Sequence, residues 1–207
     1  SSVILRSHGE PRRVHEALKA KGAKVIDAAC PNVTKIHRLV EKAEQEGRQP
    51  VIIGTPDHPE VVAIAGWCRR PVVLAGAEEW EIWLSEHPEY REKPLTLVSQ
   101  TTSTRVIWES SIEKTKKLCT NAEIFDTICS ATCTQQTEAQ ALAARSDAMI
   151  VIGDRRSSNT KRLYEISRSL CSDVRYIEDA AELTTQELGQ HQHIGITAGA
   201  STPAWII

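Results

Sequence analysis

The stretch Ile-Asp-Ala-Ala-Cys at residues 26–30 returns in altered form as Phe-Asp-Thr-Ile-Cys at residues 125–129. Each stretch places a hydrophobic residue, an aspartate and, three positions later, a cysteine ahead of a helical pattern. Cys30 and Cys129 are 99 residues apart, and each is followed after 24 residues by a glycine that ends an apolar run, Gly54 or Gly153. Several anchors at one fixed offset indicate an internal repeat.

Polar residues recur at the same offset behind the later apolar runs. The pairs, first copy before second, are His58 and Ser157, Glu60 and Asn159, and Thr102 and Ser201. The stretch Val-Ile-Leu-Arg-Ser-His-Gly at residues 3–9 resembles the segments that lead to Thr102 and Ser201, and so fits the last part of a still earlier copy. The repeat therefore predicts three similar units, of which the first is largely missing.

Short apolar runs alternate with amphipathic stretches along the chain. The runs that predict buried strands lie at residues 51–53, 72–74, 95–98, 148–152 and 194–196. The stretches that predict helices lie near residues 33–46, 105–119, 134–145 and 160–171. This alternation is typical of βαβ units, so we expect an α/β fold with small parallel sheets.

Three domains follow from the repeat. We expect a remnant of a first α/β domain at residues 1–29, a second domain at 30–125 and a third at 126–207. The chain begins with Ser-Ser-Val-Ile-Leu, which resembles the middle of a strand, and ends with Trp-Ile-Ile, where a helix is predicted to start. We therefore expect a fragment that lacks material at both ends.

The composition excludes several classes of function. The 207 residues are 41% hydrophobic and 25% charged, as in an ordinary globular protein. A net charge of −2 gives no broad field that would attract nucleic acid or an anionic membrane. No apolar run approaches the roughly 20 residues that a membrane span requires.

The cysteines Cys30 and Cys129 are candidate metal ligands. In parallel α/β sheets ligands collect beyond the carboxyl ends of strands, so three related units would direct their loops at one cavity. Converging thiolates suit iron or zinc, and one cysteine in each repeat favours an iron–sulfur cluster that bridges units. A zinc protein built on the same cysteines stays open as an alternative. We interpret the other four as small buried hydrophobic residues: Cys68, Cys119, Cys133 and Cys171.

The remaining anchors suit an anion. Ser157, Ser158 and Asn159 precede a predicted helix, where hydroxyl, amide and backbone N–H groups converge, although a simple N-cap uses the same groups. The stretch Thr-Ala-Gly-Ala-Ser-Thr-Pro at residues 197–203 precedes another predicted helix start. His8 and His58 are candidate sources of positive charge. A phosphate or diphosphate is the ligand that this set predicts.

Glu60 and Asn159 occupy equivalent positions in the repeat, and Glu60 is the carboxylate of this pair. This makes Glu60 the candidate proton donor. The alternative interpretation is a carboxylate that stabilises the start of a helix through the helix dipole.

Seven ordered motifs resemble the 4-hydroxy-3-methylbut-2-enyl diphosphate reductases, the last enzymes of the methylerythritol phosphate route to isoprenoids. The matching motifs are Arg-Ser-His-Gly at 6–9, Asp-Ala-Ala-Cys-Pro-Asn-Val-Thr-Lys at 27–35, Gly-Thr-Pro-Asp-His-Pro-Glu-Val at 54–61, Ser-Gln-Thr-Thr at 99–102, Asp-Thr-Ile-Cys-Ser-Ala-Thr at 126–132, Ser-Ser-Asn-Thr at 157–160 and Gly-Ile-Thr-Ala-Gly-Ala-Ser-Thr-Pro at 195–203. They span essentially the whole chain in the family's order.

The resemblance implies a trefoil of three α/β domains around a 4Fe–4S cluster. The family removes a hydroxyl group as water and yields isopentenyl and dimethylallyl diphosphate, with ferredoxin or flavodoxin as electron donor. By motif, the implied cluster ligands are Cys30 and Cys129, and Glu60 delivers a proton with the help of Thr101. The residues implied to hold the diphosphate are His8, His58, Ser157, Ser158, Asn159 and Ser201.

The chain also departs from the family's pattern. The segments that carry the family's first cluster cysteine and one substrate-contacting histidine have no match here, and Ala29 and Gln135 replace the usual Thr and Arg. The alternative function is therefore an inactive fragment that binds diphosphate without an intact cluster. The resemblance implies a cytoplasmic bacterial protein or a plastid protein, with a small-molecule substrate and no nucleic acid or membrane partner.

Overall fold

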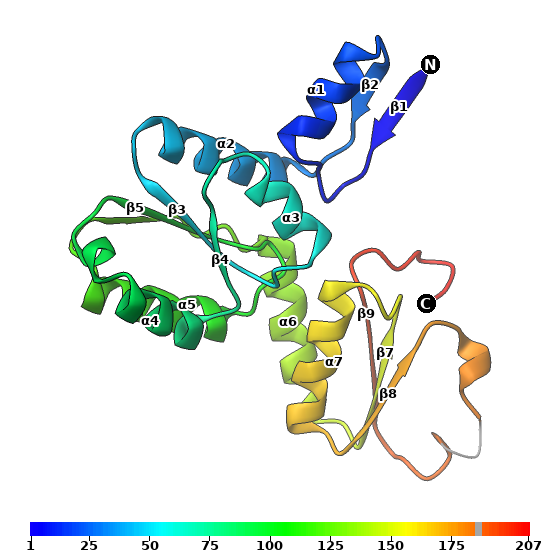
Figure 1. Ribbon diagram of the computed structural model, residues 1–207. Helices are drawn as coiled ribbons and strands as arrows, with labels where there is room; N and C mark the ends of the chain where they lie inside the picture. The colour runs from blue at the N-terminus through cyan, green and yellow to red at the C-terminus, as the bar shows by residue number, and fades with distance from the viewer. Residues whose placement is uncertain (185–187) are drawn as a thin grey trace. The chain divides into compact units, whose positions relative to one another are not determined.

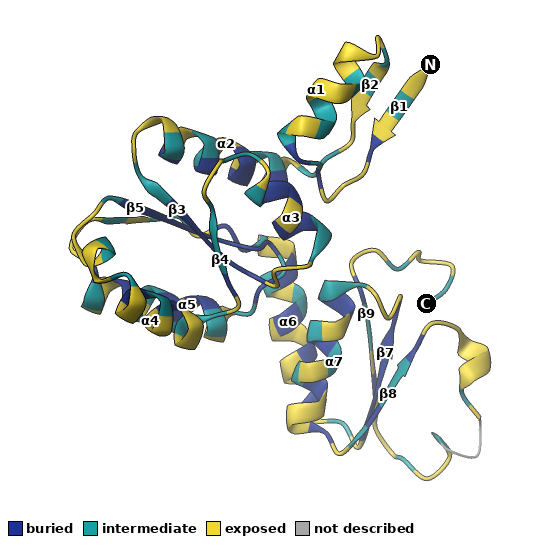
Figure 2. Ribbon diagram, in the orientation of Figure 1, coloured by how far each residue is buried: buried dark blue, intermediate teal, exposed yellow. Residues whose placement is uncertain are grey.

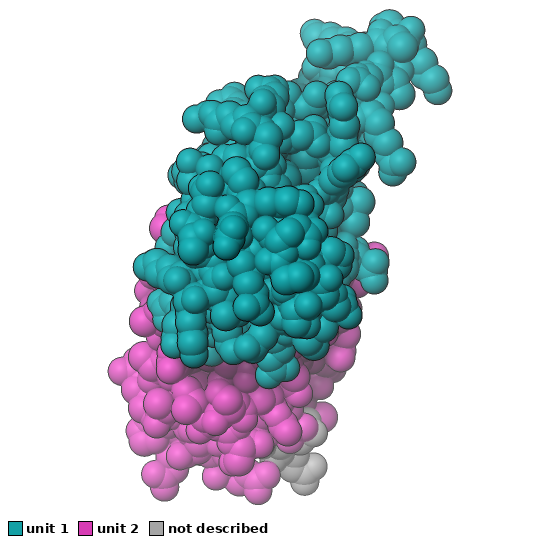
Figure 3. Space-filling view, turned by 60° about the vertical axis from the view of Figure 1, so that its left-hand side comes forward, with its two compact units in different colours: residues 1–128 teal, residues 129–207 magenta. Residues whose placement is uncertain are grey.

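The computed structural model describes residues 1–184 and 188–207. The chain divides into two compact units, which Figure 3 colours separately: unit 1 is Ser1–Ile128 and unit 2 is Cys129–Ile207. Each unit is described by itself below. The division into three domains at residues 29 and 125 stays a prediction.

Unit 1 alternates strands and helices from its first residues onward (Figure 1). Its elements in chain order are β1 (Ser2–Leu5), α1 (Arg12–Ala20), β2 (Lys24–Asp27), α2 (Pro31–Gln45), β3 (Gln49–Ile53), α3 (Pro59–Ala65), β4 (Val72–Leu74), α4 (Ala77–Glu86), a 3-10 turn (Pro88–Arg91), β5 (Leu95–Ser99), α5 (Arg105–Leu118) and β6 (Ala122–Ile124). The strand order is β1-β2 in one sheet and β4-β3-β5-β6 in the other, and every pairing is parallel.

Unit 2 continues the same alternation. Its elements are α6 (Ser130–Ala143), β7 (Ala148–Ile152), α7 (Ser158–Leu170), β8 (Asp173–Ile177), a 3-10 turn (Ala180–Glu182) and β9 (Ile194–Ala198). The parallel sheet has the order β8-β7-β9. The predicted α/β fold with small parallel sheets is confirmed.

The repeat seen in the sequence is preserved in the strand register. Ile52 of β3 lies opposite Val98 of β5, and Val151 of β7 lies opposite Thr197 of β9, so both partners shift by the same 99 residues. The β1-α1-β2 segment is also built like β5-α5-β6, because each has a helix between two paired parallel strands. The 99-residue offset therefore reflects the same arrangement of parallel strands and helices in both units.

Central strands carry the cores of both units (Figure 2). All five residues of β5 and of β7 are buried, as expected for a parallel sheet that helices cover. In unit 1, Ile52 and Val98 pack with α2 and α3, whose residues Ile36 and Ile64 are fully buried. The sheets therefore hold the strand ends, where the loops of interest begin, in fixed positions.

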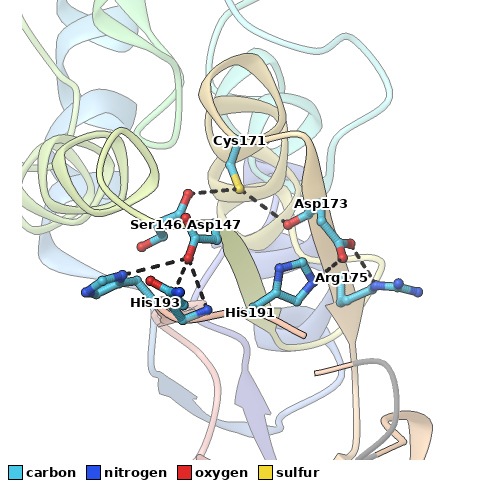
Figure 4. Close-up of polar contacts among 8 residues, drawn as sticks. Ser146, Asp147, Cys171, Asp173, Arg175, His191 and His193 are labelled. Carbon is cyan, nitrogen blue, oxygen red and sulfur yellow. Dashed lines mark hydrogen bonds and ion pairs between the residues drawn. The ribbon is translucent and has the colours of Figure 1, made fainter. Parts of the chain in front are cut away.

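Polar contacts fix the opposite, amino-terminal edge of the unit 2 sheet (Figure 4). One carboxylate oxygen of Asp147 accepts the backbone N–H groups of Gln192 and His193 at 3.1 and 3.0 Å. His191 Nε2 lies 2.9 Å from Asp173 Oδ2. These contacts attach the segment that precedes β9 to the start of β7 and of β8.

The described residues after β9 form turns up to Ile207, and the helix start expected at Trp205 stays a prediction. Thr202 N–H donates to the Gly199 carbonyl at 2.9 Å, and Ile206 N–H donates to the Pro203 carbonyl at 3.0 Å.

Leu163 of α7 is fully buried in the core of unit 2. We expect Leu163→Ala to lower the free energy of unfolding by about 2–5 kcal/mol, because it removes buried apolar surface and leaves a cavity. Urea denaturation of the chain measures this change. The control Leu170→Ala, at a side chain 47% exposed on the same helix, should change stability by less than about 0.5 kcal/mol. Equal effects of the two variants would contradict the proposed core.

Candidate functional site

The two aspartate-to-cysteine stretches form the same local structure. Asp27 Oδ1 accepts the backbone N–H of Ala29 at 2.9 Å, and Asp126 Oδ1 accepts that of Ile128 at 3.3 Å. Aspartate stabilises tight turns in this way, by bonding the backbone two residues ahead. Each turn delivers its cysteine to the N-cap position of a helix, Cys30 for α2 and Cys129 for α6.

Different contacts tether the two turns to the preceding strands. Cys30 N–H donates to the Ser7 carbonyl at 2.9 Å, next to His8. In the second copy, the buried hydroxyl of Thr127 donates to the Ser99 carbonyl at 2.6 Å and accepts the Ser99 N–H at 2.7 Å. Thr127 was not among the predicted site residues, although it lies within the Asp-Thr-Ile-Cys motif that begins at residue 126.

Glu60 and Thr101 form a close buried pair. Glu60 lies in the first turn of α3 and is 3% exposed, and Thr101 follows β5 and is 6% exposed. Thr101 donates its backbone N–H to Glu60 Oε1 and its hydroxyl to Glu60 Oε2, both at 2.7 Å. Burial raises the pKa of Glu60, while the two hydrogen bonds from Thr101 oppose that rise in part.

His58 lies beside this pair as the N-cap residue of α3. Its Nδ1 accepts the backbone N–H of Glu60 at 3.2 Å, which leaves Nε2 to carry the proton of the neutral ring. Burial, reinforced by His8 and Arg6, lowers the pKa of His58 to about 4. The ring centroids of His8 and His58 are 5.6 Å apart, edge to face, and burial also lowers the pKa of His8, followed by the effect of Arg6.

Gln100 is a second residue that sequence reasoning missed, although it lies within the quoted Ser-Gln-Thr-Thr motif. Its side chain is buried, accepts the Thr55 N–H at 3.0 Å and donates to the Thr102 hydroxyl at 2.9 Å. A Cβ on Gly54 would lie only 2.8 Å from Gln100 Cβ. Gln100 therefore joins the loop that follows β3, which leads to Glu60, to the loop that holds Thr101.

In unit 2, the predicted anion-binding residues lie at the start of α7. Ser157 is the N-cap residue, and its hydroxyl accepts the Thr160 N–H at 3.3 Å. Ser158 is half-buried, while Asn159 is 6% exposed and donates its amide to Gln135 Oε1 at 3.0 Å. Among the polar atoms that the structure describes, Asn159 Oδ1 is buried without a hydrogen-bond partner. A buried acceptor of this kind usually receives a hydrogen bond from a water molecule or from a ligand that carries a donor.

Ser201 lies in the turns that follow β9, at the same edge of the sheet as Ser157. It is exposed, in contrast to the half-buried N-cap. The turn requires glycine, because a Cβ on Gly199 would lie 2.0 Å from Thr160 Oγ1. Gly199 N–H donates to the Ile152 carbonyl at 2.9 Å, which ties the turn to β7.

The predicted site residues are divided between the two units. Unit 1 brings together His8, His58, Glu60 and Thr101, and it also contains Cys30. The rest lie in unit 2 and are Cys129, Ser157, Ser158, Asn159 and Ser201. Each unit thus contains one of the two predicted cluster cysteines and a set of polar side chains predicted to bind the diphosphate.

The cysteines differ in their surroundings, and none forms a disulfide. Cys119 and Cys171 are buried, and burial raises the pKa of the Cys68 thiol to about 12, in keeping with their interpretation as packing residues. Cys30, Cys68, Cys129 and Cys133 are half-buried. Within residues 1–184 and 188–207, no group of three or more His, Cys, Asp or Glu side chains is arranged to hold a metal ion.

The described helices include none that is both long enough and apolar enough to cross a membrane.

Comparison with known families extends over the whole chain. The family model described as LytB protein matches residues 1–207. Proteins named 4-hydroxy-3-methylbut-2-enyl diphosphate reductase from Clostridium tetani and Caldanaerobacter subterraneus are each 40% identical to the chain over 205 residues. The chain spans 31% of the first relative's length and 69% of the second's, while 99% of the chain itself is covered in both.

Solved structures with related names share the fold. One, described as (E)-4-hydroxy-3-methyl-but-2-enyl diphosphate reductase, the terminal enzyme of the non-mevalonate pathway, is 36% identical, with a TM-score of 0.65 over 99% of this chain and 72% of its own. Another, an E-1-hydroxy-2-methyl-but-2-enyl-4-diphosphate reductase from Plasmodium falciparum, is 26% identical, with a TM-score of 0.89 over 99% of this chain and 64% of its own. With a family match along its full length and relatives at 40% identity, the chain belongs to the LytB protein family.

Proposed function

We propose that the chain forms most of a reductase that acts on 4-hydroxy-3-methylbut-2-enyl diphosphate. The reaction breaks the bond between carbon and the hydroxyl oxygen, consumes two electrons and two protons, and releases water with isopentenyl or dimethylallyl diphosphate. The relatives' printed names and the family match support this substrate. The oxidoreductase class follows from the electrons that the reaction takes up.

The observation that carries the proposal is the buried pair of Glu60 and Thr101. Since burial raises its pKa, the Glu60 carboxyl keeps a proton at a pH where an exposed glutamate has lost it. The 2.7 Å contact between Glu60 Oε2 and Thr101 Oγ1 allows a proton to pass between these oxygens. We assign Glu60 as the proton donor and Thr101 as its relay partner.

Each unit contains polar groups that we assign to diphosphate binding. His8 and His58 offer N–H groups from unit 1, and the group in unit 2 comprises Ser157, Ser158, Asn159 and Ser201. The backbone N–H groups at the start of α7 suit an anion, because the helix dipole favours negative charge there.

Cys30 and Cys129 are proposed as ligands of a 4Fe–4S cluster. Their fit rests on donor chemistry, because each is a half-buried thiol at a helix N-cap, where the dipole favours the negative charge of a thiolate. Such a cluster, held by these thiolates, would supply the electrons that loss of the hydroxyl group as water requires. Ferredoxin or flavodoxin is the proposed electron donor, and the bacterial cytoplasm or the plastid is the proposed location.

We predict that Glu60→Gln lowers turnover by about 10²–10⁴-fold in the cluster-loaded protein, because glutamine keeps the shape of the pair but donates no proton in the reaction. Diphosphate binding should stay near the parent value. For the same reason, the parent's turnover should fall as the pH rises through the raised pKa of Glu60. Anaerobic turnover assays and calorimetry measure these quantities.

Glu86→Gln, at an exposed position on α4, is the matched control and should leave turnover unchanged. Near-parental turnover in Glu60→Gln would remove the proton-donor assignment. Diphosphate binding without any turnover in the loaded parent would instead favour the inactive, diphosphate-binding alternative.

Ser157→Ala and Asn159→Ala test the diphosphate assignment in unit 2. Each should weaken substrate binding by about tenfold, because each removes a hydrogen-bonding group that faces a charged ligand. The iron–sulfur charge-transfer absorbance of the reconstituted protein should not change.

Cys30→Ser and Cys129→Ser are the converse variants, and each should lose that absorbance. If the Ser157 and Asn159 variants lost the cluster spectrum but bound substrate normally, their assignment to the diphosphate would be wrong.

A further inference from the structure

A cleft of about 430 Å³ opens at the carboxyl edge of the unit 2 sheet. One wall is the loop between β7 and α7, and the other is the run of turns after β9. Its lining residues are Gly153, Asp154, Arg156, Glu178, Ser201, Thr202, Pro203 and Ile206. The cleft therefore lies between the two loops that carry the candidate anion-binding residues of this unit.

The described residues that line the cleft carry more negative than positive charge, which disfavours an anionic ligand. Arg156 is the single cation among the described lining residues, while Asp154 and Glu178 bring two carboxylates. A doubly or triply charged phosphate group would be repelled by both acids. The cleft admits such a ligand only if Arg156 faces it.

The adjacent arginine is already committed to the fold. Arg155 bonds Glu182 at 2.7 Å and the Tyr176 carbonyl at 3.2 Å, and its guanidinium lies 5.7 Å from the centre of the Tyr176 ring. Its backbone N–H also donates to Glu178 at 2.8 Å. Arg155 thus fastens the loop to β8 and to the turn that follows it.

Arg156 is held far more loosely. Its side chain is 91% exposed, and the structure gives it a single acidic partner two residues away, Asp154, through contacts of 3.2 Å from Nε and 3.0 Å from the terminal nitrogen. Exposed ion pairs of this kind contribute little to stability, so the guanidinium can change partners at small cost.

The repeat gives no architectural reason for a cation at this position. The residue 99 positions earlier, in the matching loop of unit 1, is Asp57. The two loops share a scaffold but have opposite charge at this point. The shared scaffold therefore does not require a cation at this position, and Arg156 is available for a role in the cleft of unit 2.

We propose that Arg156 is a further substrate-binding residue, which exchanges its pairing with Asp154 for bidentate hydrogen bonds to a diphosphate in this cleft. The planar guanidinium matches two phosphate oxygens at once, and it stays charged at any physiological pH. Asp154 holds the arginine while the cleft is empty. This inference rests on the proposed function, because it takes the diphosphate ester as the natural ligand.

The test is calorimetric titration of the full chain with inorganic pyrophosphate. Arg156→Ala should weaken binding by about tenfold or more and flatten its dependence on salt concentration. Arg156→Lys should recover part of the affinity, since it keeps the charge but not the planar pair of donors. Asp154→Asn should strengthen binding by removing a competing carboxylate.

Arg162→Ala is the matched control, because Arg162 lies on α7 and pairs with Glu165 outside the cleft. It should bind pyrophosphate like the parent. Circular dichroism of each variant confirms that it is folded. Isopentenyl diphosphate should show the same pattern as pyrophosphate, whereas inorganic phosphate should bind more weakly and depend less on Arg156.

Affinity within twofold of the parent in Arg156→Ala would overturn the inference, as would a parent that does not bind pyrophosphate. Weaker binding in a folded Asp154→Asn would overturn the exchange of partners. Failure of the proposed function looks different: Arg156-dependent binding of pyrophosphate would persist in a cluster-loaded protein that does not turn the substrate over.

Discussion

Two 2.7 Å hydrogen bonds from Thr101 hold the Glu60 carboxyl in a buried position, and the chemistry of unit 1 is arranged around that constraint. The carboxyl comes from the first turn of α3, which follows β3, and the hydroxyl comes from the loop after β5, so the pair exists only while these parallel strands keep their register. Gln100 joins the same two loops, and His58 caps the helix that carries the carboxyl. Burial then raises the pKa of the carboxyl and so favours its protonated form.

The repeat uses one scaffold for two kinds of chemistry. In unit 1, the buried side chain of Gln100, which follows β5, fills the space beside Gly54, whereas in unit 2 the residue 99 positions later, Gly199, follows β9 and leaves room for Thr160. The first copy consequently encloses a carboxyl, and the second forms an open cleft with a serine and an arginine at its edges. Parallel strands place every loop at the same kind of edge, and side-chain size decides whether that edge is closed or open.

Much of this arrangement could be predicted from the chain itself. The apolar runs located β3, β4, β5, β7 and β9, and the 99-residue offset identified Cys30 and Cys129 as equivalent residues ahead of helices, because these features depend on apolar pattern and turn chemistry. The roles of Thr127 and Gln100 could not be predicted, since each depends on a contact with a residue distant in sequence.

The central claim is that the Glu60 carboxyl holds its proton at a pH where an exposed glutamate has lost it. Carbon-13 NMR of glutamate-labelled protein, titrated with acid and base, measures this directly, with Glu60→Gln to assign the resonance. The account predicts a carboxyl resonance that titrates above the ordinary pKa of 4.5, because burial disfavours the charged form. Titration of Glu60 at or below 4.5 would contradict it.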